Sequence, residues 1–154
     1  MLNREYEGQD FCGVARSLEI VGERWTLLIV RDAFLGRRRF EEFQQSLGIA
    51  RNVLTDRLNR LVDEGVLDRV RYSERPERYE YRLTAKGRDL QVALTALREW
   101  GERHVLEGPP RVLRRRSDGK AVTAALVPKG TKTVAARDVE LVPAIKRRAS
   151  SRAR

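Results

Sequence analysis

The chain has 154 residues, of which 41% are hydrophobic and 35% are charged, with a formal net charge of +10. No apolar run approaches the roughly 20 residues that a membrane-spanning helix needs, and the polar N-terminus does not resemble a signal peptide. One cysteine, Cys12, and one histidine, His104, exclude an internal disulfide and a Cys/His zinc site. We therefore expect a cytoplasmic protein with no membrane partner, no metal and no cofactor.

Positive charge is concentrated in the last third of the chain. Residues 107–154 hold 13 Lys/Arg and 4 Asp/Glu, a net charge of +9, which leaves +1 for residues 1–106. Binding of nucleic acid by residues 1–106 must therefore depend on where the basic side chains lie, because their net charge is close to zero.

Apolar residues at helical spacing predict four helices in the first 64 residues. They span residues 11–21, 23–35, 39–47 and 51–64. The second is almost continuously apolar at its centre, so we expect it to be the buried helix.

Two antiparallel strands, 66–71 and 78–84, are predicted next. Their connection is longer than a tight hairpin, and Pro76 favours an exposed loop tip. Thr84 can then cap a last long helix, residues 85–106.

A Gly-Pro-Pro sequence at 108–110 ends that helix and marks a boundary. Beyond it we predict short strands at 111–116, 121–128 and 139–145, with Asp118-Gly119 as a hairpin turn. The predicted organisation is a main domain over 1–107, a small β-rich extension over 108–145, and a disordered basic tail over 146–154.

Helices, then two strands, then a helix is the order of a winged helix-turn-helix, so the predicted fold class is mainly α (α+β). The commonest use of this shape is to place one helix in the DNA major groove. Helix 51–64 would bury Leu54, Leu58 and Leu61 and carry polar side chains suited to base edges elsewhere. The candidates for DNA contact on this helix are Arg51, Asn52, Thr55, Asp56, Arg57 and Asn59.

Three further arginines are candidates for contact with the DNA backbone or the minor groove. Arg75 and Arg78 flank the tip of the two-strand wing, and Arg39 opens the third helix. The alternative for each is a solvated charge. For the whole domain, the alternative is a winged helix that binds another protein without specific DNA readout. The chain shows no Ser/His/Asp set and no phosphate-cradling glycine loop, so we expect no enzymatic activity.

A set of residues in register along 10–105 resembles the HxlR family of bacterial transcriptional regulators, relatives of the MarR proteins. The matching residues include Cys12, Gly22-Glu-Arg-Trp25, Arg31-Asp32, Gly36-Arg-Arg-Arg39-Phe40, Gly65-Val-Leu67, Pro76, Tyr81-Arg-Leu83-Thr84 and Trp100-Gly101. One departure is Ala50, where the family often has a Ser or Thr that caps the DNA-reading helix; losing such a cap costs ~1 kcal/mol.

The resemblance implies a homodimer built by the N-terminal helix and the last long helix. The candidate interface residues are Leu18, Leu90, Leu94, Leu97 and Trp100. A two-fold dimer would read double-stranded DNA with a pseudo-palindromic operator. A monomer that folds its last helix back is the alternative.

Some relatives use a cysteine in the place of Cys12 as a redox or electrophile sensor, and an inert thiol at the dimer seam is the alternative. A small-molecule effector could bind beside Trp25, Phe34 and Trp100, which otherwise belong to the core. We therefore expect a sequence-specific dimeric regulator, acting as a repressor that responds to a small molecule or to an oxidant or electrophile.

Overall fold

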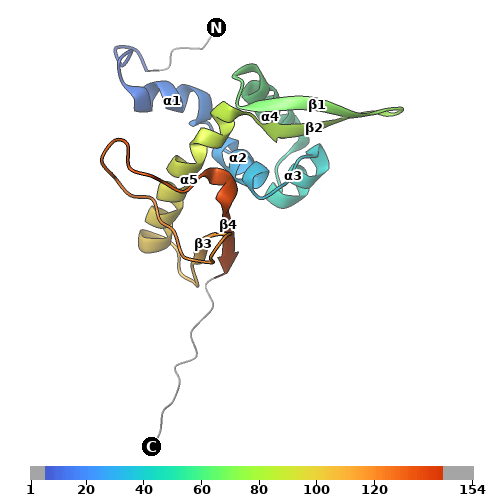
Figure 1. The fold of residues 1–154 in the computed structure, drawn as a ribbon. Coiled ribbons are helices and arrows are strands. Elements are labelled where there is room, and N and C mark those ends of the chain that lie inside the picture. The colour runs from blue at the N-terminus through green and yellow to red at the C-terminus, as the bar shows by residue number, and fades with distance from the viewer. Residues whose placement is uncertain (1–5, 144–154) are drawn as a thin grey trace, which may run out of the picture. The chain divides into compact units, whose positions relative to one another are not determined.

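The computed structural model describes residues 6–143 (Figure 1). The chain divides into two compact units, Met1–Gln91 and Val92–Arg154. The predicted domain boundary at residue 107 stays a prediction, and the predicted disordered tail at 146–154 lies outside the described residues. Within the described part, none of the helices is long and apolar enough to cross a membrane.

Four helices open the first unit. They are α1 (Gly13–Val21), α2 (Thr26–Phe34), α3 (Phe40–Leu47) and α4 (Arg51–Asp63). Fully buried side chains from three of them meet in one core: Ile29, Val30, Phe43, Leu54, Leu58 and Leu61. The prediction that the second helix is buried is confirmed at its centre, and the inward leucine stripe of the fourth is confirmed completely.

The first two helices begin later than predicted, at Gly13 and Thr26. Trp25 takes a left-handed conformation with φ of 78°, which cannot continue into a helix, so α2 begins at Thr26. A Cβ on Gly22 would lie 2.4 Å from the Leu18 carbonyl oxygen, so only glycine fits the turn that precedes it. Phe11, the first residue of the helix predicted over 11–21, lies before α1 and is fully exposed.

The wing consists of β1 (Leu67–Glu74) and β2 (Glu77–Leu83), paired antiparallel. The long loop predicted between the strands is wrong, because pairing continues past a bulge between Arg71 and Ser73 and ends at Glu74 opposite Glu77. A two-residue turn remains, and the Ser73 hydroxyl donates to the Pro76 carbonyl oxygen at 2.8 Å across it. The wing is therefore longer and more regular than its sequence suggested.

Helix α5 (Ala85–His104) begins directly after the wing. The predicted cap is confirmed: the Thr84 hydroxyl accepts the Gly87 N–H at 3.0 Å and donates to the Gly65 carbonyl oxygen at 2.7 Å. Four helices, a two-stranded wing and a following helix form a winged helix-turn-helix, as predicted.

The second unit contains the rest of α5 and a small sheet in which β3 (Arg111–Arg115) pairs antiparallel with β4 (Val139–Pro143). A short 3-10 helix, η1 (Ala136–Asp138), directly precedes β4. The strand predicted at 121–128 is wrong beyond a single bridge between Ala121 and Arg114. The Thr123 hydroxyl and the Ala124 N–H donate to Glu99 of α5, so this segment follows the helix instead of the sheet. The predicted turn at Asp118-Gly119 is confirmed by a Gly119 φ of 66°.

Candidate nucleic-acid interface

Helix α4 presents opposite faces to the core and to solvent. Three leucines are fully buried on one side, as described above. On the other side the exposed residues are Arg51, Asn52, Thr55, Asp56 and Asn59. The structure therefore brings together five of the six candidates on this helix, with the hydrogen-bonding groups that base edges require.

Arg57 is the exception, because its side chain turns toward the protein and is only 18% exposed. Its guanidinium binds Glu23, donates to the Arg24 carbonyl oxygen at 3.2 Å, and also contacts Asp56. Its helical position three residues after Leu54 and one before Leu58 was a signal for this orientation, whereas its distant partner Glu23 had no signal in the sequence.

Aromatic rings support two of the candidate arginines. The Arg51 guanidinium lies over the Phe40 ring, 4.6 Å from its centre, and that of Arg39 lies over Tyr72 at 4.8 Å. Such stacking favours a defined side-chain orientation and leaves the N–H groups at the edge of the guanidinium free to donate. The sequence analysis predicted neither ring contact. Phe40 is on the helix before Arg51 and Tyr72 is on the wing, so each ring belongs to a different element from its arginine.

The turn before α3 places Arg39 at the helix N-cap. The N–H groups of Arg38 and Arg39 donate to the Glu42 carboxylate at 2.8 and 3.0 Å, and these bonds hold the pKa of Glu42 below its ordinary value. The Tyr81 N–H donates to the Arg38 carbonyl oxygen at 2.7 Å, which ties this turn to the wing. The first helix of the helix-turn-helix and the wing are thereby held together.

Most wing arginines are engaged within the wing itself. Arg69 lies over the Tyr79 ring at 3.8 Å, and Arg71 pairs with Glu77 at 3.4 Å. The Tyr79 hydroxyl donates to Glu77, which lowers the pKa of Glu77 and raises the pKa of Tyr79.

Arg75 and Arg78, the two predicted tip contacts, differ from these arginines in their side-chain contacts. Both are exposed, and neither makes an ion pair or a side-chain hydrogen bond with the residues that the structure describes. Their guanidinium groups are therefore unpaired at the end of the wing, where a phosphate could accept from them.

Three arginines of the second unit are engaged by neighbouring residues. Arg116 binds Glu140 at 3.1 Å, and Arg114 donates to the Gly119 carbonyl oxygen at 2.8 Å. The Arg115 guanidinium beside Asp118 lowers the pKa of that carboxyl to about 2. The guanidinium groups of these three arginines are thus engaged within the second unit.

The predicted sensor and effector residues belong to elements other than α4 and the wing. Cys12 is half-buried at the N-cap of α1, the helix end that the sequence suggested. Trp25 and Phe34 are half-buried in the first unit, and Trp100 is exposed in the second.

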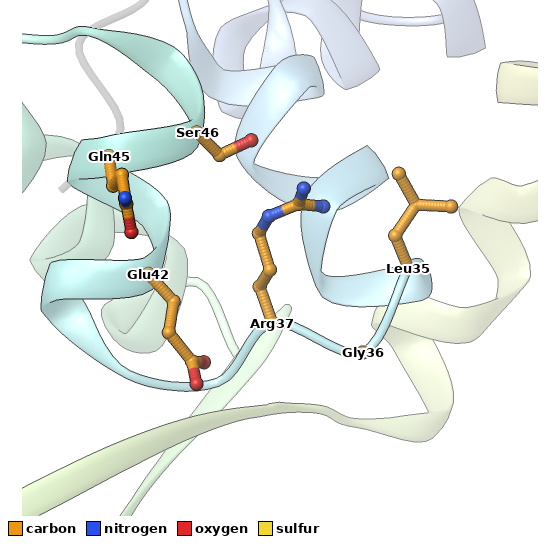
Figure 2. A pocket seen from close by; sticks show the side chains of 6 residues that line it. All are labelled: Leu35, Gly36, Arg37, Glu42, Gln45 and Ser46. Atoms are coloured by element: carbon orange, nitrogen blue, oxygen red, sulfur yellow. The ribbon is translucent and has the colours of Figure 1, made fainter.

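An open hollow of about 410 Å³ lies between the segment that follows α2 and helix α3 (Figure 2). It is lined by Leu35, Gly36, Arg37, Glu42, Gln45 and Ser46, and by none of the three predicted aromatic residues. Figure 2 shows the Arg37 side chain between those of Leu35 and Ser46. No group of three or more His, Cys, Asp or Glu residues suited to a metal occurs among residues 6–143.

Known proteins match the segment that contains the winged helix-turn-helix. Residues 20–108 match the model of the HxlR-like helix-turn-helix family. The HTH-type transcriptional regulator Rv3095 of Mycobacterium tuberculosis is 48% identical over 128 residues, covering 82% of this chain and 79% of that protein. YdeP of Bacillus subtilis, also named an HTH-type transcriptional regulator, is 33% identical over 106 residues, covering 67% of this chain and 83% of YdeP.

Solved structures of transcriptional regulators are also similar to this chain. PA1607, described as a transcription factor, superposes with a TM-score of 0.70 at 46% identity, covering 79% of this chain and 87% of PA1607. The redox regulator HypR in its reduced form gives a TM-score of 0.56 at 32% identity, covering 58% of this chain and 90% of HypR.

Proposed function

This chain belongs to the HxlR-like helix-turn-helix family and is a transcriptional regulator; on that premise we propose that it is a sequence-specific, dimeric repressor that reads DNA with α4. The observation that carries the proposal is the two-sided character of α4, with fully buried leucines on one face and five exposed polar side chains on the other. A face without large apolar groups suits base edges and water better than a protein partner.

The wing extends the proposed interface to the DNA backbone. Arg75 and Arg78 are unpaired within the described part of the chain, and two guanidinium groups at a wing tip can each contact a phosphate or enter a narrow minor groove. Arg39 supplies a third cationic contact at the start of α3. In this arrangement α4 supplies sequence preference, while the arginines outside it supply affinity and register.

Exposed apolar residues on α1 and α5 support the dimer. On α1, Val14 is 70% and Leu18 is 39% exposed; on α5, Leu97 is 52% and Trp100 is 57% exposed. Large apolar side chains repeated along a helix mark a surface that a partner covers. A two-fold dimer would present two copies of α4 to a pseudo-palindromic operator, and bound at a promoter it would exclude polymerase.

Cys12 is the proposed sensor of an oxidant or electrophile. It is half-buried, it starts a helix, and the structural neighbour HypR is a redox regulator. A small-molecule effector beside Trp25, Phe34 or Trp100 remains the second route to regulation. Because the chain has one cysteine, Cys12→Ser should abolish any oxidant response while leaving DNA affinity intact, and a response that survives would rule the thiol out.

Fluorescence anisotropy tests the DNA-reading proposal. The full chain is titrated with duplexes selected from a random library and with scrambled duplexes, over a range of salt. Asn52→Ala should relax preference at particular bases, whereas Arg78→Ala should weaken both duplexes and reduce the salt slope by about 0.9 per lost phosphate contact. Arg137→Ala, which removes an exposed arginine of the second unit, is the matched control and should change little.

Unchanged affinity for both duplexes in both variants would show that α4 and the wing tip do not touch DNA. Equal binding of selected and scrambled duplexes by the unaltered protein would refute sequence-specific reading altogether.

A further inference from the structure

A cluster of charges holds the inner edge of α4 to the turn between α1 and α2. The two carboxylate oxygens of Glu23 bind different arginines of α4: one binds Arg57 at 2.5 Å and the other binds Arg60 at 2.6 Å. Each arginine also donates to a backbone carbonyl oxygen of the same region, Arg57 to Arg24 and Arg60 to Glu19. Glu23 is thus the shared acceptor of two arginines from successive turns of one helix.

These contacts are partly shielded from water. The side chains of Glu23, Arg57 and Arg60 are 29%, 18% and 31% exposed. Shielding strengthens the attraction between such groups, and removing one partner leaves the others without compensation. Loss of Glu23 should therefore release both arginines together.

The turn that carries Glu23 is itself restricted. Gly22 leaves no room for a side chain beside the Leu18 carbonyl oxygen, and Trp25 is held at a positive φ. An acceptor placed on a restricted turn can fix the direction of a helix. The leucine stripe of α4 determines which face is buried, and the ion pairs with Glu23 add directional contacts to that packing.

One of the two arginines reaches the face of α4 that we propose reads DNA. The Arg57 guanidinium, anchored on Glu23, also contacts the Asp56 carboxylate, whose side chain is 72% exposed. A carboxylate facing DNA is repelled by phosphates unless its charge is compensated, and it is useful when it accepts from a cytosine amino group. The series Glu23, Arg57, Asp56 supplies that compensation and orients the carboxylate.

We infer that Glu23 is a positioning residue for DNA reading: through Arg57 and Arg60 it sets the orientation of α4 and presents Asp56 to the bases. The inference rests on the proposed function of α4. Glu23 itself touches no DNA in this arrangement, so its removal should change which sequences are preferred and leave phosphate contacts in place.

The test compares full-length Glu23→Gln, Glu23→Ala and unaltered protein on duplexes selected from a random library and on scrambled duplexes. The ratio of the two affinities should fall roughly tenfold or more, as expected when an oriented base contact is lost. Affinity for the scrambled duplex and its salt slope should stay within about twofold, because no phosphate contact is removed. A merely structural defect would reduce the active fraction and weaken both duplexes alike.

Two further variants sharpen the result. Asp63→Asn makes the same charge change at an exposed position of α4 and should keep the ratio. Arg60→Gln should lower the ratio as Glu23→Gln does, and the double variant should lose less than the product of the two separate losses, since both act through one contact.

Three outcomes decide the matter. A reduced ratio in Glu23→Gln, with unchanged scrambled binding, supports the inference even if Glu23→Ala fails to fold. A ratio within about twofold of the unaltered protein in folded Glu23→Gln overturns the inference and leaves the proposed function standing. Absence of any preference in the unaltered protein overturns both.

Discussion

Replacing Gly87 by alanine should destabilise the protein, although alanine is the better helix former. Gly87 lies in the first turn of α5, where a Cβ would be 2.2 Å from the Val66 carbonyl oxygen and 2.9 Å from a Leu83 methyl carbon. Real Cβ atoms do not approach other atoms closer than 3.0 Å, so the start of α5 must move by roughly 0.8 Å away from a backbone oxygen. That displacement also stretches the Thr84 bonds to Gly65 and Val66.

Two opposing contributions to the free energy of unfolding can be compared, helix propensity and steric overlap. Alanine gains about 1 kcal/mol of helix propensity over glycine. Overpacking against a wall that cannot relax costs about 1–3 kcal/mol, and each weakened hydrogen bond costs about 1 kcal/mol. The steric term prevails, with a net loss of about 2 kcal/mol, which corresponds to a Tm lower by about 4–8 °C.

Thermal unfolding followed by circular dichroism measures this shift, with urea unfolding as the second assay. Gly101→Ala is the matched control, because it is the same change in the same helix and no atom lies within 4 Å of its added Cβ. That variant should be more stable than the unaltered protein by up to about 1 kcal/mol. If Gly87→Ala melts at or above the temperature of Gly101→Ala, close packing of α5 on Val66 is refuted.

Three other substitutions have defined outcomes. Thr84→Ala should cost about 1 kcal/mol in urea unfolding, because it removes the hydroxyl that caps α5. Glu42→Gln should lower the urea midpoint at neutral pH, because the lowered pKa of the Glu42 carboxyl stabilises the folded protein above the unfolded pKa of 4.5. This stabilisation is lost as the pH falls through the folded pKa, so the difference in urea midpoint between the variant and the unaltered protein should disappear in acid. Trp100→Glu should shift the protein from dimer to monomer in analytical ultracentrifugation, since it places a charge on the exposed apolar face of α5; an unchanged dimer would exclude that face as the interface.

The order of elements and the identity of the core could be predicted from the sequence because both follow from local spacing. Leu54, Leu58 and Leu61 recur at helical intervals, and all three are fully buried. Residues exposed on α4, from Arg51 to Asn59, follow from the same spacing by exclusion. The resemblance to a family of regulators also lay in the sequence itself, since glycines, tryptophans and the wing proline are in register.

What the sequence could not decide was which polar side chains meet across the fold. Arg57 was a candidate for DNA contact. Its position beside the leucine stripe indicated that it could turn inward, but only the structure identifies its partner as Glu23, more than 30 residues earlier in the chain. Tyr72 supports Arg39 from the wing, and Glu99 draws residues 123–124 away from the small sheet. Periodicity is set by neighbours within a few residues and determines which face is buried. Ion pairs and stacked rings between distant segments depend on how the elements pack, and only the tertiary structure decides them.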